Sequence, residues 1–111
     1  NLGGIKVSSL QIEEIVGRVE GVRETAAIAV SPPGGGPDML VVYVVPIVEG
    51  QLTAGDLLSA MQQVIRTELN PLFNVHDVVI TQALPRTASN KIMRRTLRAD
   101  YEDQRSFGQK A

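Results

Sequence analysis

The sequence predicts a small α+β domain in which helices flank a three-stranded β-sheet, with the remnant of a β-hairpin at the N-terminus. Its length of 111 residues is typical of one domain and excludes two packed domains. Some segments carry apolar residues at helical spacing, and others are short apolar runs with strand character. Their order along the chain is helix, strand, strand, helix, strand, helix, so we expect one sheet covered by two helices.

The chain opens with a turn. Gly3 and Gly4, followed by residues 5–7 (IKV), are typical of a tight turn that leads into a short strand. Only two residues precede this turn, and we favour a chain that begins inside a hairpin over a flexible start.

The first helix follows at once. Ser8 is a predicted N-cap, and Gln11 completes a capping box with it. Apolar residues then recur at helical spacing, and the helix is expected to end between Arg18 and Gly21. These apolar residues are Ile12, Ile15, Val16 and Val19.

Three segments have strand character. Residues 25–30 form a short apolar run, and residues 31–38 (SPPGGGPD) form a loop because Pro and Gly disfavour regular structure. Residues 39–45 (MLVVYVV) are continuous and β-branched, so we expect a central strand that is covered on both faces. Residues 75–81 give the third strand.

Two further helices complete the pattern. Thr53 is a predicted N-cap, Asp56 suits the positive end of the helix dipole, and Asn70-Pro71 ends this second helix. A last helix is expected over residues 93–103, followed by a frayed polar tail from Gln104. The buried stripe of the second helix is expected to consist of Leu57, Leu58, Met61, Val64, Ile65 and Leu69.

Composition excludes several classes of function. A net charge of −1 and only two Tyr and two Phe argue against a dedicated nucleic-acid binder. The chain has no Cys, and its single histidine, His76, has no cluster of carboxylates around it, so no metal site is expected. We interpret His76 as a strand-edge residue. No apolar run is long enough to span a membrane.

Basic residues concentrate near the C-terminal end. Residues 78–99 contain no Asp or Glu but five of the 11 Lys and Arg residues: Arg86, Lys91, Arg94, Arg95 and Arg98. Arg94 and Arg95 fall in the first turn of the last helix, where the helix dipole disfavours cations, so helix stability does not explain the cluster. Arg98 can form an i,i+4 pair with Glu102. Charge alone leaves two interpretations open, a solvated basic face and an anion-binding site.

Two motifs at opposite ends of the chain favour the anion-binding site over the solvated basic face. Residues 1–13 (NLGGIKVSSLQIE) and residues 84–98 (LPRTASNKIMRRTLR) resemble the hinge-proximal segment and the C-terminal lysine motif of AMP-forming acyl-CoA synthetases. Residues 69–73 (LNPLF) are similar to the acetyl-CoA-synthetase-like acyl-activating enzymes. The resemblance implies that residues 1–111 are the mobile C-terminal cap domain of a larger ligase, with the hinge just before Asn1. It also implies a large N-terminal adenylation domain as partner.

The resemblance implies a two-step reaction. A carboxylic acid and ATP give an acyl adenylate, and CoA then displaces AMP, with Mg²⁺ held mainly by the N-terminal domain. The cap domain rotates between the two steps. Lys91 matches the catalytic lysine of the first step, in which its ammonium stabilises charge between the carboxylate and the α-phosphate.

Further roles follow from the same resemblance. Gly3 and Gly4 match the turn that lines the CoA channel, where any Cβ would obstruct the ligand. Lys6 matches a basic residue near the adenylate phosphate, and Arg66 an arginine near the CoA nucleotide. Taken without the resemblance, these are a plain turn, an exposed strand residue and an arginine paired with Asn70 or Glu68.

Three of the four arginines in the cluster are expected to dock the last helix or to contact the large domain. They are Arg94, Arg95 and Arg98.

Two positions depart from the family pattern. Asn90 stands where Gly is commonest, and Asn tolerates left-handed backbone better than most residues. Lys6 stands where many relatives have Arg, and a single ammonium loses bidentate contact with phosphate.

Alternatives to the ligase are an adenylation domain that loads a carrier protein and a stand-alone anion- or RNA-binding module. The final residues, Gln109-Lys110-Ala111, are not the Ser-Lys-Leu peroxisomal signal and do not establish the compartment. We expect a soluble protein and leave cytoplasm and peroxisome open.

Overall fold

The computed structural model describes residues 8–32, 34–36, 38–71 and 73–110, and the side chains among them up to residue 104. The predicted Gly3-Gly4 turn and the strand that follows it lie outside the described residues. The elements, in chain order, are α1 (Ser9–Val16), β1 (Val22–Val30), β2 (Met39–Pro46), α2 (Ala54–Glu68), β3 (Val75–Ile80) and α3 (Arg94–Lys110).

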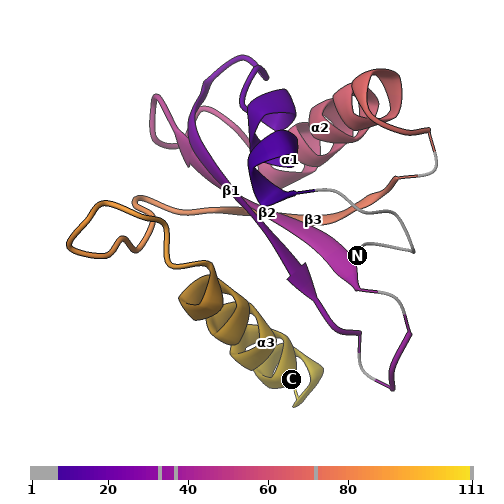
Figure 1. Ribbon diagram of the computed structural model, residues 1–111, viewed down its shortest axis with the longest axis vertical. Helices are drawn as coiled ribbons and strands as arrows, with labels where there is room; N and C mark the ends of the chain where they lie inside the picture. Colours follow the sequence, from indigo (N-terminus) through magenta and orange to yellow (C-terminus); the bar gives the residue numbers. More distant parts are fainter. Residues whose placement is uncertain (1–7, 33, 37, 72, 111) are drawn as a thin grey trace.

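The three strands form one sheet in the order β1-β2-β3, so β2 is central, as predicted. β1 and β2 pair antiparallel across the Pro/Gly-rich loop. β2 and β3 pair parallel, because α2 carries the chain back across the sheet between them. Figure 1 shows this crossover. The register of β1 shifts between Val22 and Glu24, where Arg23 is the extra residue of an irregularity.

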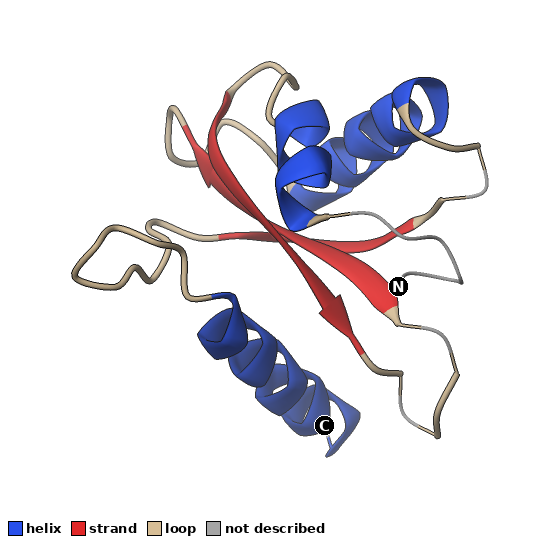
Figure 2. Ribbon diagram, viewed as in Figure 1, coloured by secondary structure: helices blue, strands red, loops and turns tan. Residues whose placement is uncertain are grey.

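Helices cover both faces of the sheet. α1 and α2 pack on one face, where Ile12, Met61 and Ile65 meet Val42 and Val44 in a buried cluster. α3 packs on the other face. There Leu97 and Tyr101 meet Ala26, Ile28 and Tyr43. Within the described part of the chain three helices cover the sheet, and the expected cover by two is wrong because α3 also buries apolar residues on it (Figure 2).

Three predicted boundaries are wrong. α1 ends at Val16 with Gly17 as its C-cap, because the next two amides, of Arg18 and Val19, bond to carbonyls three residues back, and the chain then turns through Gly21 at φ 89°. β1 begins at Val22 rather than Thr25, because its first residues still pair with the end of β2. α3 continues to Lys110 rather than ending at Asp103, since no proline interrupts it.

The stripe predicted for α2 is divided between buried and partly buried positions. Leu57, Met61 and Ile65 are buried. The other three, Leu58, Val64 and Leu69, pack against the core from its edge.

One carboxylate joins three elements. Glu13 of α1 accepts hydrogen bonds from the Arg94 guanidinium of α3, with Nη2 at 2.7 Å from Oε1 and Nε at 3.1 Å from Oε2. Its Oε2 also accepts from the Ala27 amide of β1 at 2.8 Å. The Glu13 side chain is only 11% exposed. This pairing explains why an arginine is tolerated in the first turn of α3, where the helix dipole disfavours cations.

A second arginine docks the same helix. Arg98 Nε donates to the carbonyl oxygen of Ala29 at 2.8 Å. No ion pair joins Arg98 to Glu102 among the described side chains, because the guanidinium is turned toward β1 instead. The expected docking of the last helix by Arg94 and Arg98 is therefore observed.

Two tyrosines link α3 to the sheet. The Tyr43 hydroxyl of β2 donates to the carbonyl oxygen of Leu97 at 3.3 Å, and the Tyr101 hydroxyl donates to Asp77 of β3 at 2.9 Å. Burial, together with the negative charges of Asp100 and Asp77, raises the pKa of Tyr43 to about 12.

Removal of the Glu13 carboxylate tests its linking role. We expect Glu13→Ala to lower the free energy of unfolding by about 2–4 kcal/mol, because Arg94 and the Ala27 amide lose their acceptor. Arg18→Ala is the matched control. Arg18 pairs with Glu14 and Glu68 on the surface, and loss of such exposed pairs costs at most about 1 kcal/mol. Urea denaturation of the 111-residue chain measures both, and equal losses would contradict the linking role.

Alkaline pH tests the environment of Tyr43. The folded state holds the Tyr43 proton more tightly than the unfolded chain, in which the pKa is about 10. Unfolding therefore releases a proton between about pH 10 and 12, and the free energy of unfolding falls as the pH rises through that interval. Tyr43→Phe removes this titration and should flatten the decline, at a cost of about 1 kcal/mol near neutral pH for the lost hydrogen bond. Urea denaturation across this range makes the comparison, and parallel profiles for the two proteins would contradict it.

Candidate functional site: the lysine loop

The segment between β3 and α3 folds into a closed turn, which we call the lysine loop (residues 86–92). An antiparallel bridge between Arg86 and Ile92 closes its base. Inside it, the Thr87 amide donates to the Lys91 carbonyl oxygen and the Asn90 amide donates to the Thr87 carbonyl oxygen, both at 2.9 Å. The loop therefore has its own hydrogen-bonded backbone.

Local sequence explains this geometry. Pro85 stiffens the entry, and its carbonyl oxygen accepts from the Met93 amide at 2.8 Å. The Thr87 hydroxyl lies 3.1 Å from that of Ser89 and accepts from the Lys91 amide at 3.2 Å. Asn90 has a φ of 68°, as predicted for the residue that replaces glycine here.

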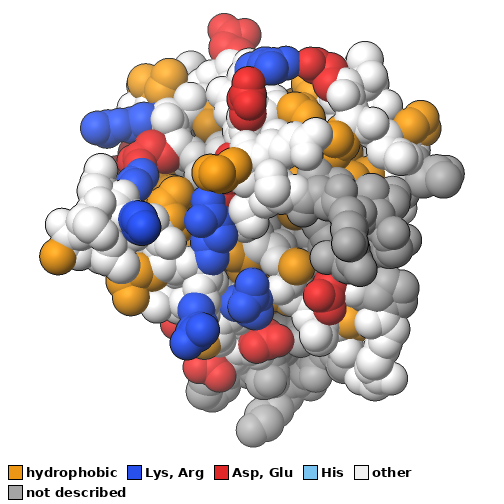
Figure 3. Space-filling view, viewed as in Figure 1, with side chains coloured by type: hydrophobic (Ala, Val, Ile, Leu, Met, Phe, Trp, Pro, Cys, Tyr) orange, Lys and Arg blue, Asp and Glu red, His pale blue; other side chains and the backbone are white. Residues whose placement is uncertain are grey.

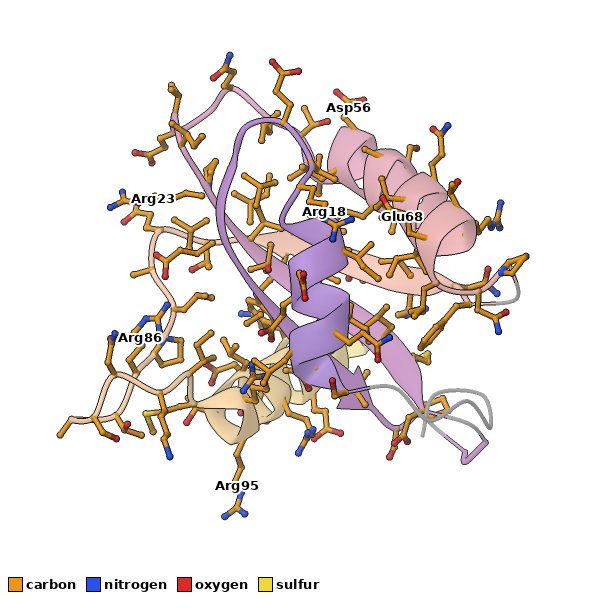
Figure 4. The ribbon with its side chains drawn as sticks, turned by 45° about the horizontal axis from the view of Figure 1, so that its top comes forward. Arg18, Arg23, Asp56, Glu68, Arg86 and Arg95 are labelled. Atoms are coloured by element: carbon orange, nitrogen blue, oxygen red, sulfur yellow. The ribbon has the colours of Figure 1, made fainter. Side chains whose placement is uncertain are left out.

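The Lys91 side chain is exposed and has no hydrogen-bond or ion-pair partner among the described residues. Arg23 and Arg95 share this property within the described part of the chain, and Arg95 points away from the domain (Figure 4). The other described cations have partners: Arg18, Arg66, Arg86, Arg94 and Arg98. Lys91 thus combines a bonded backbone with a free ammonium.

The surface around the loop is basic. Figure 3 shows Lys and Arg side chains gathered over the segment before α3 and the first turns of that helix. Arg94 and Arg98 are turned inward to Glu13 and Ala29, so of the predicted cluster Lys91 and Arg95 are the described cations left without a protein partner.

Arg66 lies elsewhere. It is on α2, which covers the sheet face opposite α3, and its Nη2 donates to Asn74 Oδ1 at 3.4 Å. A shallow cavity of about 540 Å³ surrounds it, lined also by Ser59, Gln62, Gln63 and Thr67. Glu68, one of its expected partners, pairs with Arg18 instead (Figure 4). The structure therefore does not bring Arg66 and Lys91 together.

Other predicted site residues lie outside the description or carry no site. Gly3, Gly4 and Lys6 lie outside the described residues. His76 is exposed on the edge strand β3. Within the described ranges no group of three or more His, Asp and Glu side chains is placed to hold a metal ion. None of the helices described is both long and apolar enough to cross a membrane.

Sequence reasoning missed Glu24. This residue of β1 pairs with Arg86, 62 positions further along the chain. An acidic residue at the start of a strand has no local pattern that reveals such a partner. The nearby irregularity in the strand register is likewise visible only in the folded chain.

Comparison with known protein families identifies the family of this chain. The sequence model of the family described as AMP-binding enzyme C-terminal domain matches residues 11–91, so the chain belongs to this family, as the motifs predicted.

Relatives of known sequence agree with this membership. The chain is 49% identical over 102 residues to a protein named probable acyl-activating enzyme 17, peroxisomal, from Arabidopsis thaliana. It is 45% identical over 104 residues to hexanoyl-CoA synthase from Cannabis sativa. These alignments cover 88% and 91% of this chain but only 14% of each relative.

Solved structures share the fold. An acyl-CoA synthetase from Brucella canis superposes with a TM-score of 0.77 at 22% identity, over 92% of this chain and 19% of that one. ATP-bound MatB from Rhodopseudomonas palustris superposes with a TM-score of 0.74 at 24% identity, over 91% and 19%. In both cases the domain described here corresponds to a small part of a larger chain.

Proposed function

We propose that this chain is the C-terminal domain of an AMP-forming carboxylate–CoA ligase and that Lys91 is its adenylation lysine. The observation that carries the proposal is the ammonium of Lys91, which has no partner among the described residues, on a loop that is closed by several backbone hydrogen bonds. Family membership and the names of the relatives supply the reaction class.

The first half-reaction needs a cation. A carboxylate oxygen attacks the α-phosphorus of ATP, the bond to the β-phosphate oxygen breaks, and pyrophosphate leaves. Negative charge from both reactants then crowds between the carboxylate and the α-phosphate. An ammonium delivered to that point in a water-poor cleft stabilises the transition state. Because Lys91 has no partner among the side chains that the structure describes, it need not break an ion pair with them in order to enter the cleft.

The N-terminal adenylation domain is the partner that builds the cleft. We assign to it most of the ATP and carboxylate contacts and the Mg²⁺ ion, as membership of the family implies. Lys6 is proposed to contact the adenylate phosphate.

The second half-reaction needs another surface. The CoA sulfur attacks the acyl carbon, the bond to the phosphate oxygen breaks, and AMP leaves. We propose that Gly3 and Gly4 line the channel for CoA and that Arg66 binds its nucleotide end. Arg66 lies on α2 over one face of the sheet, whereas Ile92 at the base of the lysine loop packs with the cluster on the α3 face, so we infer that a single docked orientation would not present both cations. This separation supports a domain that rotates between the steps.

The names of the relatives support a choice of acceptor and of compartment. Relatives are named as CoA synthetases, which supports CoA rather than a carrier protein. Two proteins from Arabidopsis thaliana are named as peroxisomal, and we propose the peroxisome for this chain on that basis.

Lys91→Ala in the full-length protein tests the assignment. We expect carboxylate-dependent ATP–pyrophosphate exchange, with hexanoate and acetate as probes, to fall about 100- to 1,000-fold because the transition state loses its cation. Formation of hexanoyl-CoA from preformed hexanoyl adenylate should change by less than about twofold, since that step does not use the ammonium.

Arg18→Ala is the control, because it removes an exposed cation that lies far from the lysine loop (Figure 4). It should leave both half-reactions near their wild-type rates. An equal loss in both half-reactions for Lys91→Ala would refute its role.

A further inference from the structure

Arg86 makes two contacts that the proposed function does not use. Its Nη1 donates to the Asn90 carbonyl oxygen at 3.0 Å, and its Nη2 pairs with the Glu24 carboxylate of β1. One guanidinium therefore bridges the lysine loop and the sheet. Figure 4 shows Arg86 beside this loop, well apart from Arg18 and Glu68.

The carbonyl that Arg86 holds belongs to the peptide unit directly before Lys91. That unit has two polar atoms, the oxygen of Asn90 and the nitrogen of Lys91. Arg86 binds the oxygen, and the Thr87 hydroxyl accepts from the nitrogen at 3.2 Å. Hydrogen bonds therefore hold both polar atoms of this planar peptide unit. The orientation of the unit influences the direction in which the Lys91 side chain leaves the backbone.

The small energy expected of the Arg86–Glu24 pair indicates that its role is to orient the lysine loop rather than to stabilise the fold. The Arg86 and Glu24 side chains are 32% and 35% exposed, and pairs of this kind contribute at most about 1 kcal/mol. An arginine suits the position because its planar fork can donate to two acceptors at once, whereas a lysine is a point charge.

We propose that Arg86, anchored by Glu24, is a positioning residue that aims Lys91. This inference rests on the proposed function, in which Lys91 must enter a cleft built by another domain. Glu24 directly follows the register irregularity at Arg23. Through its contact with Arg86, the position of Glu24 in β1 therefore affects the orientation of Lys91, which lies 67 positions later in the chain.

The test measures both half-reactions of the full-length protein for four variants. For Arg86→Ala we expect kcat of hexanoate adenylation to fall about 10- to 100-fold, because a displaced reacting group costs this much, with the KM for ATP nearly unchanged. Thioester formation from preformed hexanoyl adenylate should stay within about twofold of wild type. Arg86→Lys keeps the charge but not the fork, so it should preserve the melting temperature and still lose at least about 10-fold in adenylation.

Two further variants distinguish failure of the proposed function from failure of the positioning role. Arg18→Ala removes an exposed ion pair far from the loop and should leave adenylation near wild type. Lys91→Ala is the reference, and normal adenylation in that variant would overturn the proposed function and the positioning role with it. Loss in Lys91→Ala with wild-type rates in Arg86→Ala or Arg86→Lys would overturn the positioning role alone. Equal loss of both half-reactions in Arg86→Lys, or a changed KM with unchanged kcat, would also overturn it.

Discussion

Two arginine–carboxylate contacts fix the C-terminal third of this domain to its N-terminal third. Glu13 holds Arg94, three residues after Lys91, and Glu24 holds Arg86, five residues before it. The lysine loop is thus attached on each side to a carboxylate, one from α1 and one from β1. Glu13 lies on α1, which packs against β1, and Glu24 belongs to β1 itself, so both carboxylates attach the loop to the same edge strand of the sheet.

The same contacts account for the uneven distribution of charge. The chain as a whole is nearly neutral, with a net charge of −1. In the fold, Glu13 and Glu24 neutralise the arginines next to the lysine loop, and the ammonium of Lys91 stays without a partner among the described residues. The role that we propose for Lys91 benefits from this arrangement, since a cation already paired would have to lose that partner before it could stabilise an anionic transition state.

How far the sequence predicts the molecule depends on whether the signal is local. Ser8 and Thr53 cap their helices as expected, and the β-branched run of β2 is central and buried on both faces, because caps and runs are read from neighbouring residues. The left-handed Asn90 is predicted for the same reason. The Glu24–Arg86 pair and the inward turn of Arg98 join segments more than 60 residues apart, and no spacing rule predicts them. The same holds for the cover of α3 over the second sheet face, which only the folded chain reveals.

The central claim is that distant carboxylates hold the backbone of the lysine loop still while the Lys91 ammonium stays free. ¹⁵N relaxation of the 111-residue chain measures this directly through the amide order parameters of residues 86–92. The account predicts values of about 0.8 or higher, similar to those of β2. Values below about 0.6 in this loop, with β2 rigid, would contradict it.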